Sequence, residues 1–540
     1  MTSQGIALPS VRRKETRLRK VTKIQPRLID CCINVCMAFI GQYAEYERCS
    51  YCREPRKTDK GHPRCCYVYI PLTHRLKLQY EHPRRAQTLT SYRAGFHRNN
   101  EALRDFFDGD LYHDFHIQEK GLFADPHDIA LHMSLDGIQL TNQRTFSVCP
   151  VILINLNLPP EERYRVTNML TCMIIPGPQK AKDLDSFLLP LVEEMLELDH
   201  GVEAFDSNTG TPFTLKAWIT IITGDGPAIA DAIGFKTPGN AKRPCRTCMI
   251  EAQRCPEAKI HYVPHSDQDI RSLPLRTDLR MVIELVETAS DDEYRKKFGI
   301  NRKCLLLQLH SLHFPRSFPA DIMHCVLQNV TPTIWRLWNR TKLAVDDPKE
   351  SESCLEDYYI SKDQLDLIDI ALAAARADIP TYLGHALRQI SRHYNGFKAA
   401  EWDAWLRFYG VPLLDQHIPN EVFMYSYACA NWHLLLNRSW LTFASLASFM
   451  YLLLSVHCSI QTSFELMNWL LALYRSTKSY ITKDLMRDCQ FALLIYTISS
   501  TSPTIFKTVV QLDTGGNFLW RDTVVLLSQR LAQSRSSTPA

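Results

Sequence analysis

The stretch "IALHMSLDG" (residues 129–137) decides the fold because its residues alternate in character. Apolar side chains stand at Ile129, Leu131, Met133 and Leu135, and the polar His132, Ser134 and Asp136 lie between them or at the end. A period of two residues is typical of a half-buried strand. The pattern therefore predicts a strand that ends at Asp136, directly before a glycine.

The sequence on both sides of this stretch predicts further elements of a mixed sheet. Strands are predicted at 150–159 ("PVILINLNLP"), 168–178 ("NMLTCMIIPGP") and 215–225 ("LKAWITIITGD"), and a helix is predicted at 183–201. The last strand also ends at an aspartate, Asp225, 89 residues after Asp136. Beyond about residue 257 the pattern is mostly helical, so the fold class expected is α+β.

The two strand-end aspartates have two interpretations. Each could cap the helix after it or begin a turn, as aspartate often does. Alternatively, Asp136 and Asp225 could meet at the edge of the sheet and share divalent cations. Mg²⁺ prefers oxygen ligands, and a pair of such ions supports phosphodiester cleavage. That chemistry usually needs a third carboxylate, often from a later helix.

Composition sets limits on the class of protein. The chain has 540 residues, 45% of them hydrophobic, and a net charge of +4, which is typical of a globular protein with several domains. Its N-terminus lacks the apolar core of a secretory signal, so we expect an intracellular protein whose 18 cysteines are not disulfides. The apolar stretch 440–464 is long enough to span a bilayer. Its serines, threonines and histidine favour a buried helix, so no membrane is expected as a partner.

The first 66 residues combine positive charge and cysteine. Eight lysines or arginines lie between Arg12 and Arg27, which predicts a mobile tail, a nuclear-import signal or an arm that contacts phosphates. Seven cysteines follow in residues 31–66. The spacing C-x3-C-x12-C-x2-C predicts a tetrahedral Zn²⁺ site at Cys32, Cys36, Cys49 and Cys52. His62, Cys65 and Cys66 remain alternative ligands.

A second cysteine pair, Cys245 and Cys248, also has the C-x2-C spacing. Its remaining zinc ligands could be Cys255, His261 or His265, and a redox pair or buried thiols are the alternatives.

Several ordered motifs closely resemble the transposases of CACTA (En/Spm-like) DNA elements. The most specific are Asn-Leu-Pro-Pro (157–160), Ile-Ile-Pro-Gly-Pro (174–178) and Pro-Cys-Arg-Thr-Cys (244–248). The resemblance also includes "FPADIMHCVLQNV" (318–330) and "KAAEWDAWLRFYGVPLL" (398–414), and it covers roughly residues 30–490. It implies a ribonuclease-H-like catalytic core with a DDE-type metal site, a large helical insertion and DNA, at transposon ends, as partner.

The resemblance assigns site residues by position. The catalytic aspartates fall on Asp136 and Asp225, with Asp206 as a competitor for the second position. The Asp-x-x-His feature falls on Asp321 and His324. Gln328 stands where related sequences carry a glutamate. A neutral amide is a much poorer ligand for Mg²⁺ or Mn²⁺, so cleavage should be weak or absent unless Asp321 or another acid, such as Glu401, substitutes.

The combined prediction divides the chain into six segments. These are a basic mobile tail (1–30), a zinc module (31–70), a helical connector (71–127), the ribonuclease-H-like core (128–257), a mostly helical region (258–490) and a divergent tail (491–540). The ends of the chain are shorter than is usual in the family, which predicts a shortened, decaying or repurposed copy. A nuclear location is expected, and a homo-oligomer is left open.

Overall fold

The computed structural model describes residues 11–98, 104–113, 121–139, 147–177, 179–254, 261–262, 273–274, 276, 292–339, 360–375 and 386–414. The chain divides into two compact units, Met1–Asp321 and Ile322–Ala540. Each unit is described by itself. Predictions for the stretch 440–464, for the tail 491–540, and for Cys255 and His265 lie outside the described residues.

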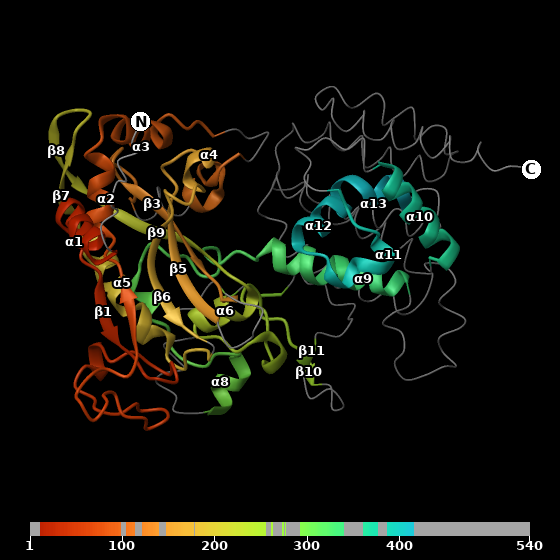
Figure 1. Cartoon of the computed structure of the whole chain (residues 1–540), viewed down its shortest axis with the longest axis horizontal. Helices are drawn as coiled ribbons and strands as arrows, with labels where there is room; N and C mark the ends of the chain where they lie inside the picture. Colours follow the sequence, from red (N-terminus) through yellow and green to blue (C-terminus); the bar gives the residue numbers. More distant parts are fainter. Residues whose placement is uncertain are drawn as a thin grey trace, which may run out of the picture. The chain divides into compact units, whose positions relative to one another are not determined.

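Unit 1 is built on one large sheet. Its strands are β1 (Arg27–Asp30), β2 (Cys66–Tyr69), β3 (Ile129–Leu135), β4 (Ile138–Gln139), β5 (Ser147–Asn155), β6 (Leu170–Pro176) and β9 (Ala217–Thr223). Six of them lie in the order β1-β2-β6-β5-β3-β9, and β4 pairs with β5. Figure 1 labels β1, β3, β5, β6 and β9 of this sheet. Strand β3 is antiparallel to β5 and parallel to β9. The predicted α+β class with a mixed sheet is therefore confirmed.

The helices of unit 1 connect and cover these strands. They are α1 (Val11–Thr22), α2 (Thr73–Tyr80), α3 (Pro83–Ala94), α4 (Pro160–Arg163), α5 (Leu184–His200), α6 (Gly226–Ala232) and α8 (Asp292–Phe298). Asp183 caps α5, because its side chain accepts a hydrogen bond from the backbone N–H of Ser186. One face of α5 then buries Phe187, Leu188, Leu191, Val192, Met195 and Leu198. This is the face predicted from the sequence.

The main core lies between the sheet and α5. It includes the apolar face of β3 (Ile129, Leu131, Met133, Leu135), which the alternation predicted. A smaller aromatic cluster covers Ala130 and Trp218 and contains Phe107, Tyr112 and Phe123. Residues 300–318 also contribute Ile300, Leu306, Leu312, Phe314 and Phe318 to the main core.

The observed units differ from the six predicted segments. The predicted tail contains α1 and the edge strand β1, and β2 lies inside the predicted zinc module. The first unit continues to Asp321 instead of ending near residue 257. The reason is physical: residues 300–318 bury their apolar side chains in the same core as the sheet. The division into six segments stays a prediction.

Two small hairpins complete unit 1. Strands β7 (Val202–Asp206) and β8 (Thr211–Leu215) pair around a short turn, and β10 (Gln253–Arg254) pairs with β11 (His261–Tyr262). The first hairpin was not predicted as such.

The described residues of unit 2 are helical. They form a π-helical turn Met323–Val330 (η7), α9 (Thr331–Trp338), α10 (Lys362–Ala375), α11 (Ile390–His393), α12 (Ala399–Ala404), a second π-helical turn Trp405–Tyr409 (η10) and α13 (Gly410–Leu414). Their core is rich in tryptophan, with Trp335, Trp402 and Trp405 almost fully buried. Among the described residues, no helix is long and apolar enough to cross a membrane.

Candidate metal centres

The strand-end aspartates leave the sheet side by side. In the parallel pair β3–β9, Ser134 lies opposite Thr223. Asp136 and Asp225 each lie two residues beyond this pair, so both follow the carboxyl ends of neighbouring parallel strands. Gly224 allows the close approach, because a Cβ atom there would lie 2.1 Å from the Leu135 carbonyl oxygen. The register thus places the ends of two neighbouring strands, each followed by an aspartate, side by side, although the aspartates are 89 residues apart in the chain.

A half-buried thiol, Cys149, lies near enough to both aspartates to be affected by their charges. Cys149 lies on β5, beside β3. Burial and the negative charges of Asp136, Asp231 and Asp225 together raise the pKa of the Cys149 thiol to about 11. Sequence reasoning missed Cys149 and Asp231.

Local hydrogen bonds hold both aspartates. Asp225 caps α6, because its Oδ1 accepts a hydrogen bond of 2.5 Å from the backbone N–H of Ala228. Asp136 Oδ1 accepts one of 2.7 Å from the N–H of Gly137. The capping interpretation is thus observed for Asp225. It does not exclude a cation, since a carboxylate has further lone pairs besides the one that accepts this bond.

The competitor Asp206 has structural partners. It is fully buried at the end of β7, where it accepts a hydrogen bond from the N–H of Asn208 and lies 3.1 Å from Nε2 of His127. Burial alone would raise the pKa of Asp206, but the bonds from His127 and Asn208 outweigh burial and lower it. Asp206 therefore stabilises the turn between β7 and β8, and these two strands form a sheet of their own.

The Asp-x-x-His feature falls on the boundary between the units. Asp321 is the last residue of unit 1, and His324 and Gln328 lie in the π-helical turn η7 of unit 2. Gln328 is exposed, and Nδ2 of the neighbouring Asn329 donates to the His324 carbonyl. The catalytic roles predicted for these residues stay predictions. So does the substitution by Glu401, which pairs with Arg388.

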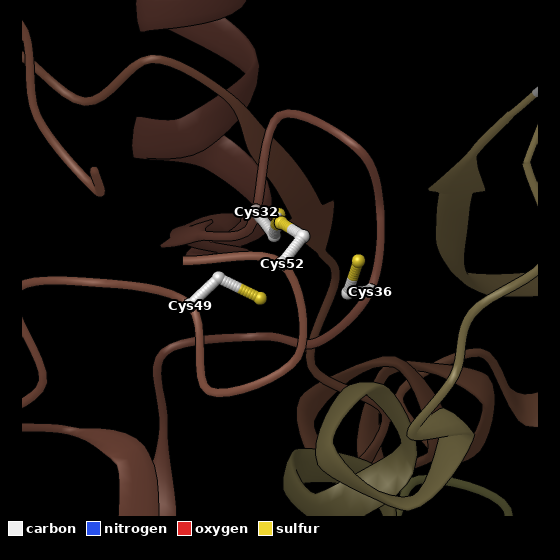
Figure 2. A group of neighbouring side chains, drawn as sticks. All are labelled: Cys32, Cys36, Cys49 and Cys52. Carbon is white, nitrogen blue, oxygen red and sulfur yellow. Dashed lines mark hydrogen bonds between the residues drawn. The ribbon is translucent and has the colours of Figure 1, made fainter. Parts of the chain in front are cut away.

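The four cysteines chosen from the sequence come together. The sulfur atoms of Cys32, Cys36, Cys49 and Cys52 all lie within 4.8 Å of one another, between two loops (Figure 2). Three of the four residues are buried. Sulfur atoms bound to one Zn²⁺ lie about 2.3 Å from it, so a cluster of this size can close around a metal ion. The cluster could hold a metal such as zinc, as predicted.

Hydrogen bonds preorganise the cluster. The N–H of Asn34 donates to Cys32 Sγ at 3.4 Å, and the Asn34 amide donates to Cys52 Sγ at 3.6 Å. Burial opposes ionisation of Cys52, yet the backbone bond from Glu54 and the bonds from Cys32 and Asn34 lower its pKa to about 6. Burial raises the pKa of Cys32 to about 11. One thiolate is thus favoured before any metal arrives, and a metal must displace protons from the others.

The alternative ligands lie elsewhere. His62 is exposed, Cys65 is half-buried, and Cys66 is exposed on β2. Among the described residues, the Cys32–Cys52 group is the one set of three or more potential ligands that converges.

The cysteine loops are fastened to the first turn of α5. The carbonyl of Cys36 accepts hydrogen bonds from the N–H groups of Lys182 and Asp183, at 3.0 and 2.9 Å. Ser186 Oγ accepts one from the N–H of Ala38, and the Tyr43 hydroxyl donates to Asp183. The cluster therefore supports the helix that connects β6 to the hairpin before β9.

The second pair has the turn geometry of a metal-binding cysteine loop. Cys245 Sγ accepts hydrogen bonds from the N–H groups of Thr247 and Cys248, at 3.3 and 3.4 Å. A hydrogen bond from the Cys248 thiol lowers the pKa of Cys245 to about 5, although burial opposes this. Two ligands do not complete a zinc site, and a zinc ion at this pair remains a prediction.

A comparison with protein families assigns the central part of the chain. Residues 100–295 match the family described as Transposase family tnp2. The tnp2 match includes Asp136, Asp225 and the Cys245–Cys248 pair, and it supports a transposase or transposase-derived protein. None of the curated proteins matches the chain.

Proposed function

We propose that this protein is a CACTA-type DNA transposase, or derives from one, and that its sheet is a ribonuclease-H-like core. The observation that carries the proposal is the parallel β3–β9 pair with an aspartate after each strand. The tnp2 match over residues 100–295 and the strand order β6-β5-β3-β9 support it. In such a core the strand that crosses over through a helix returns parallel to the first strand.

The chemistry proposed is phosphodiester cleavage and strand transfer at transposon ends. Asp136 and Asp225 would hold the divalent cations, and Asp321 would add a third carboxylate. Bound Mg²⁺ or Mn²⁺ supplies the activation of water and the stabilisation of the leaving oxygen. The role of the chain is to bring the carboxylates together and to orient them, and the capping bond to the Ala228 N–H orients Asp225.

Gln328 favours a second candidate, a DNA-binding remnant without catalysis. An amide at this position keeps the shape of a glutamate but offers no formal charge to a cation. Under this alternative the protein folds, binds DNA and does not cut it.

The cysteine sites and the basic N-terminus are assigned supporting roles. Zn²⁺ at Cys32, Cys36, Cys49 and Cys52 would be structural, since four protein ligands leave no open position. The exposed Arg17, Arg19 and Lys20 on α1 would contact DNA phosphates or direct the protein to the nucleus.

The experiment compares nicking of a supercoiled plasmid that carries the element's terminal repeats, in Mg²⁺ and in Mn²⁺. A transposase nicks this plasmid more than a plasmid without the repeats, and Asp136→Asn abolishes the nicking. Under the remnant alternative, wild-type protein retards the DNA in a gel without nicking it, and Gln328→Glu restores nicking. If neither protein nicks or binds DNA, the proposal is rejected.

A further inference from the structure

One segment of unit 1 connects the second cysteine pair to the carboxylate end of β9. Residues 311–319 run beside β9 in the same direction. Ser311 Oγ donates to the Ile219 carbonyl at 2.7 Å, and further along the Ser317 carbonyl accepts from the N–H of Ile222 at 2.8 Å. Both serines are almost fully buried. These bonds hold Ser317 beside Ile222, three residues before Asp225.

This direction matters for Asp321. Asp225 lies three residues after Ile222, and Asp321 lies four residues after Ser317. Three or four residues span at most about 10–14 Å. Asp225 and Asp321 therefore follow, by three and four residues, a pair of residues that one hydrogen bond joins.

Arg246 holds the segment at the point where it leaves β9. Its Nε donates to the Phe318 carbonyl at 2.9 Å, and a terminal nitrogen donates to the Pro319 carbonyl at 2.8 Å. The planar guanidinium suits this pair of successive acceptors, which a lysine could not satisfy with the same geometry. Phe318 itself is buried against Phe314 in the main core. The backbone just before Asp321 is thus fixed from two sides.

Arg246 is in turn fixed by the turn that carries it, since it is the second residue of the Cys245–Cys248 loop. The buried Arg276 also holds this loop, because its Nε donates a hydrogen bond to the Cys245 carbonyl at 2.7 Å. The backbone N–H of Arg276 donates to the Thr247 carbonyl at 2.9 Å. The cysteine loop is therefore a rigid base for the Arg246 side chain.

We propose that Arg246 is a positioning residue that sets Asp321 beside Asp225. The cysteine loop then acts on the carboxylate site through the Phe318 and Pro319 carbonyls, without touching a cation. This inference rests on the proposed function, because it assigns Asp321 to the same cation site. It also has a consequence that does not depend on cations, namely that residues 317–321 stay fixed on β9.

The first experiment measures amide hydrogen exchange of the full chain without divalent cations. Arg246→Ala should speed exchange at least about tenfold at Ile222 and in peptides that cover 317–321, because Ile222 donates to the segment that Arg246 holds. Arg243→Ala is the matched control. It removes a guanidinium three residues away that pairs with Glu251, so exchange at 317–321 should not change. Unchanged exchange in Arg246→Ala overturns the inference.

The second experiment titrates Mn²⁺ by electron paramagnetic resonance. Arg246→Ala should weaken binding about tenfold, as the loss of a residue that orients a ligand does. Asp321→Asn should weaken it at least as much, and adding Arg246→Ala to Asp321→Asn should have no further effect. Arg246→Lys should show an intermediate affinity. Zinc content and the melting temperature of each variant are measured in parallel, so that a folding defect is recognised.

The outcomes separate the inference from the proposed function. If Asp136→Asn abolishes Mn²⁺ binding but Arg246→Ala leaves it unchanged, the inference alone is overturned. If the effects of Arg246→Ala and Asp321→Asn simply add, Arg246 does not act through Asp321. If wild-type binding of Mn²⁺ does not depend on Asp136, the proposed function is overturned as well.

Discussion

The four-cysteine cluster and the aspartate pair are two candidate metal centres built in opposite ways. Cys32, Cys36, Cys49 and Cys52 lie within 21 residues of chain, and two short loops bring them together. Asp136 and Asp225 follow neighbouring strands only because β9 pairs with β3 after a connection of 81 residues, 136–216. The cluster depends on local loops and could hold a metal such as zinc, whereas the aspartate pair depends on the whole sheet. The two centres should therefore respond differently to mutation.

The largest effect on stability is expected at the cluster. Cys49→Ser removes a fully buried ligand and should abolish zinc binding. It should lower the free energy of unfolding by more than about 4 kcal/mol, since a structural zinc site contributes directly to folding. Metal analysis and urea denaturation measure both effects. Cys66→Ser, at an exposed cysteine outside the cluster, is the control and should change stability by less than about 0.5 kcal/mol. Full zinc content in Cys49→Ser would contradict the local-site description.

The second-largest effect is a loss of stability at low pH, and it arises from His132 on β3. Burial lowers the pKa of His132 to about 4 from 6.5, and its Nε2 lies 2.6 Å from Thr223 Oγ1. The unfolded chain therefore binds a proton more readily than the folded one. The contribution of neutral His132 to the free energy of unfolding is complete above pH 6.5, and it is lost as the pH falls from 6.5 to 4. Its size is about 3 kcal/mol.

Comparison with His132→Gln isolates this contribution. Glutamine retains a hydrogen-bonding group for Thr223 but does not titrate. Urea denaturation between pH 4 and 6.5 should show a steeper loss for wild-type protein than for the variant. Zinc release at low pH affects both proteins equally, so the difference belongs to the sheet. Equal slopes would show that His132 is protonated in the folded protein.

A smaller effect is expected at Asp225, where two substitutions separate the role of the helix cap from the role of the negative charge. Asp225→Asn keeps a side-chain acceptor for the Ala228 N–H, and Asp225→Ala removes it. Alanine should therefore lower the free energy of unfolding by about 1 kcal/mol, and asparagine by much less. Both variants should lose Mn²⁺ binding, because both lose the negative charge. Retention of Mn²⁺ binding in either variant would show that Asp225 is a helix cap and not a ligand for the cation.

The smallest effect on stability is expected at Asp136. This residue is half-buried after the last residue of β3 and caps no helix. Asp136→Asn should change the free energy of unfolding by less than about 0.5 kcal/mol while Mn²⁺ binding is lost. Chemical denaturation and a Mn²⁺ titration on the same preparation test this. A large loss of stability would mean that the carboxylate serves the fold and not a cation.

The sequence predicted the elements that have a clear period or spacing. Alternation at residues 129–135 and the apolar face of 183–201 predicted β3 and α5, because burial on one side imposes these periods. Cysteine spacing predicted the four clustered ligands because short loops limit which sulfur atoms can meet. The predicted strand 215–225 was correct in kind and too long at both ends, since β9 covers Ala217–Thr223.

Elements defined by tertiary contact were not predictable. Strands β1 and β2 have four residues each, too few to show a period, and they exist because they extend the sheet beyond β6. The β7–β8 hairpin could have been suspected from the turn residues Asn208, Thr209 and Gly210 between two extended runs. Arg246 carries no signal of its own, because its partners are backbone carbonyls more than 70 residues away.

The bonds from Lys182 and Asp183 to the Cys36 carbonyl have a consequence for how the protein is made. A ribosome releases the N-terminus first, so all four cysteines emerge about 130 residues before Asp183 does. The loops can capture their ion while the rest of the chain is still being synthesised. When Lys182 and Asp183 emerge at the start of α5, the Cys36 carbonyl is already in place to accept their hydrogen bonds. Zinc supply during translation would then govern the yield of folded protein more than zinc supply afterwards.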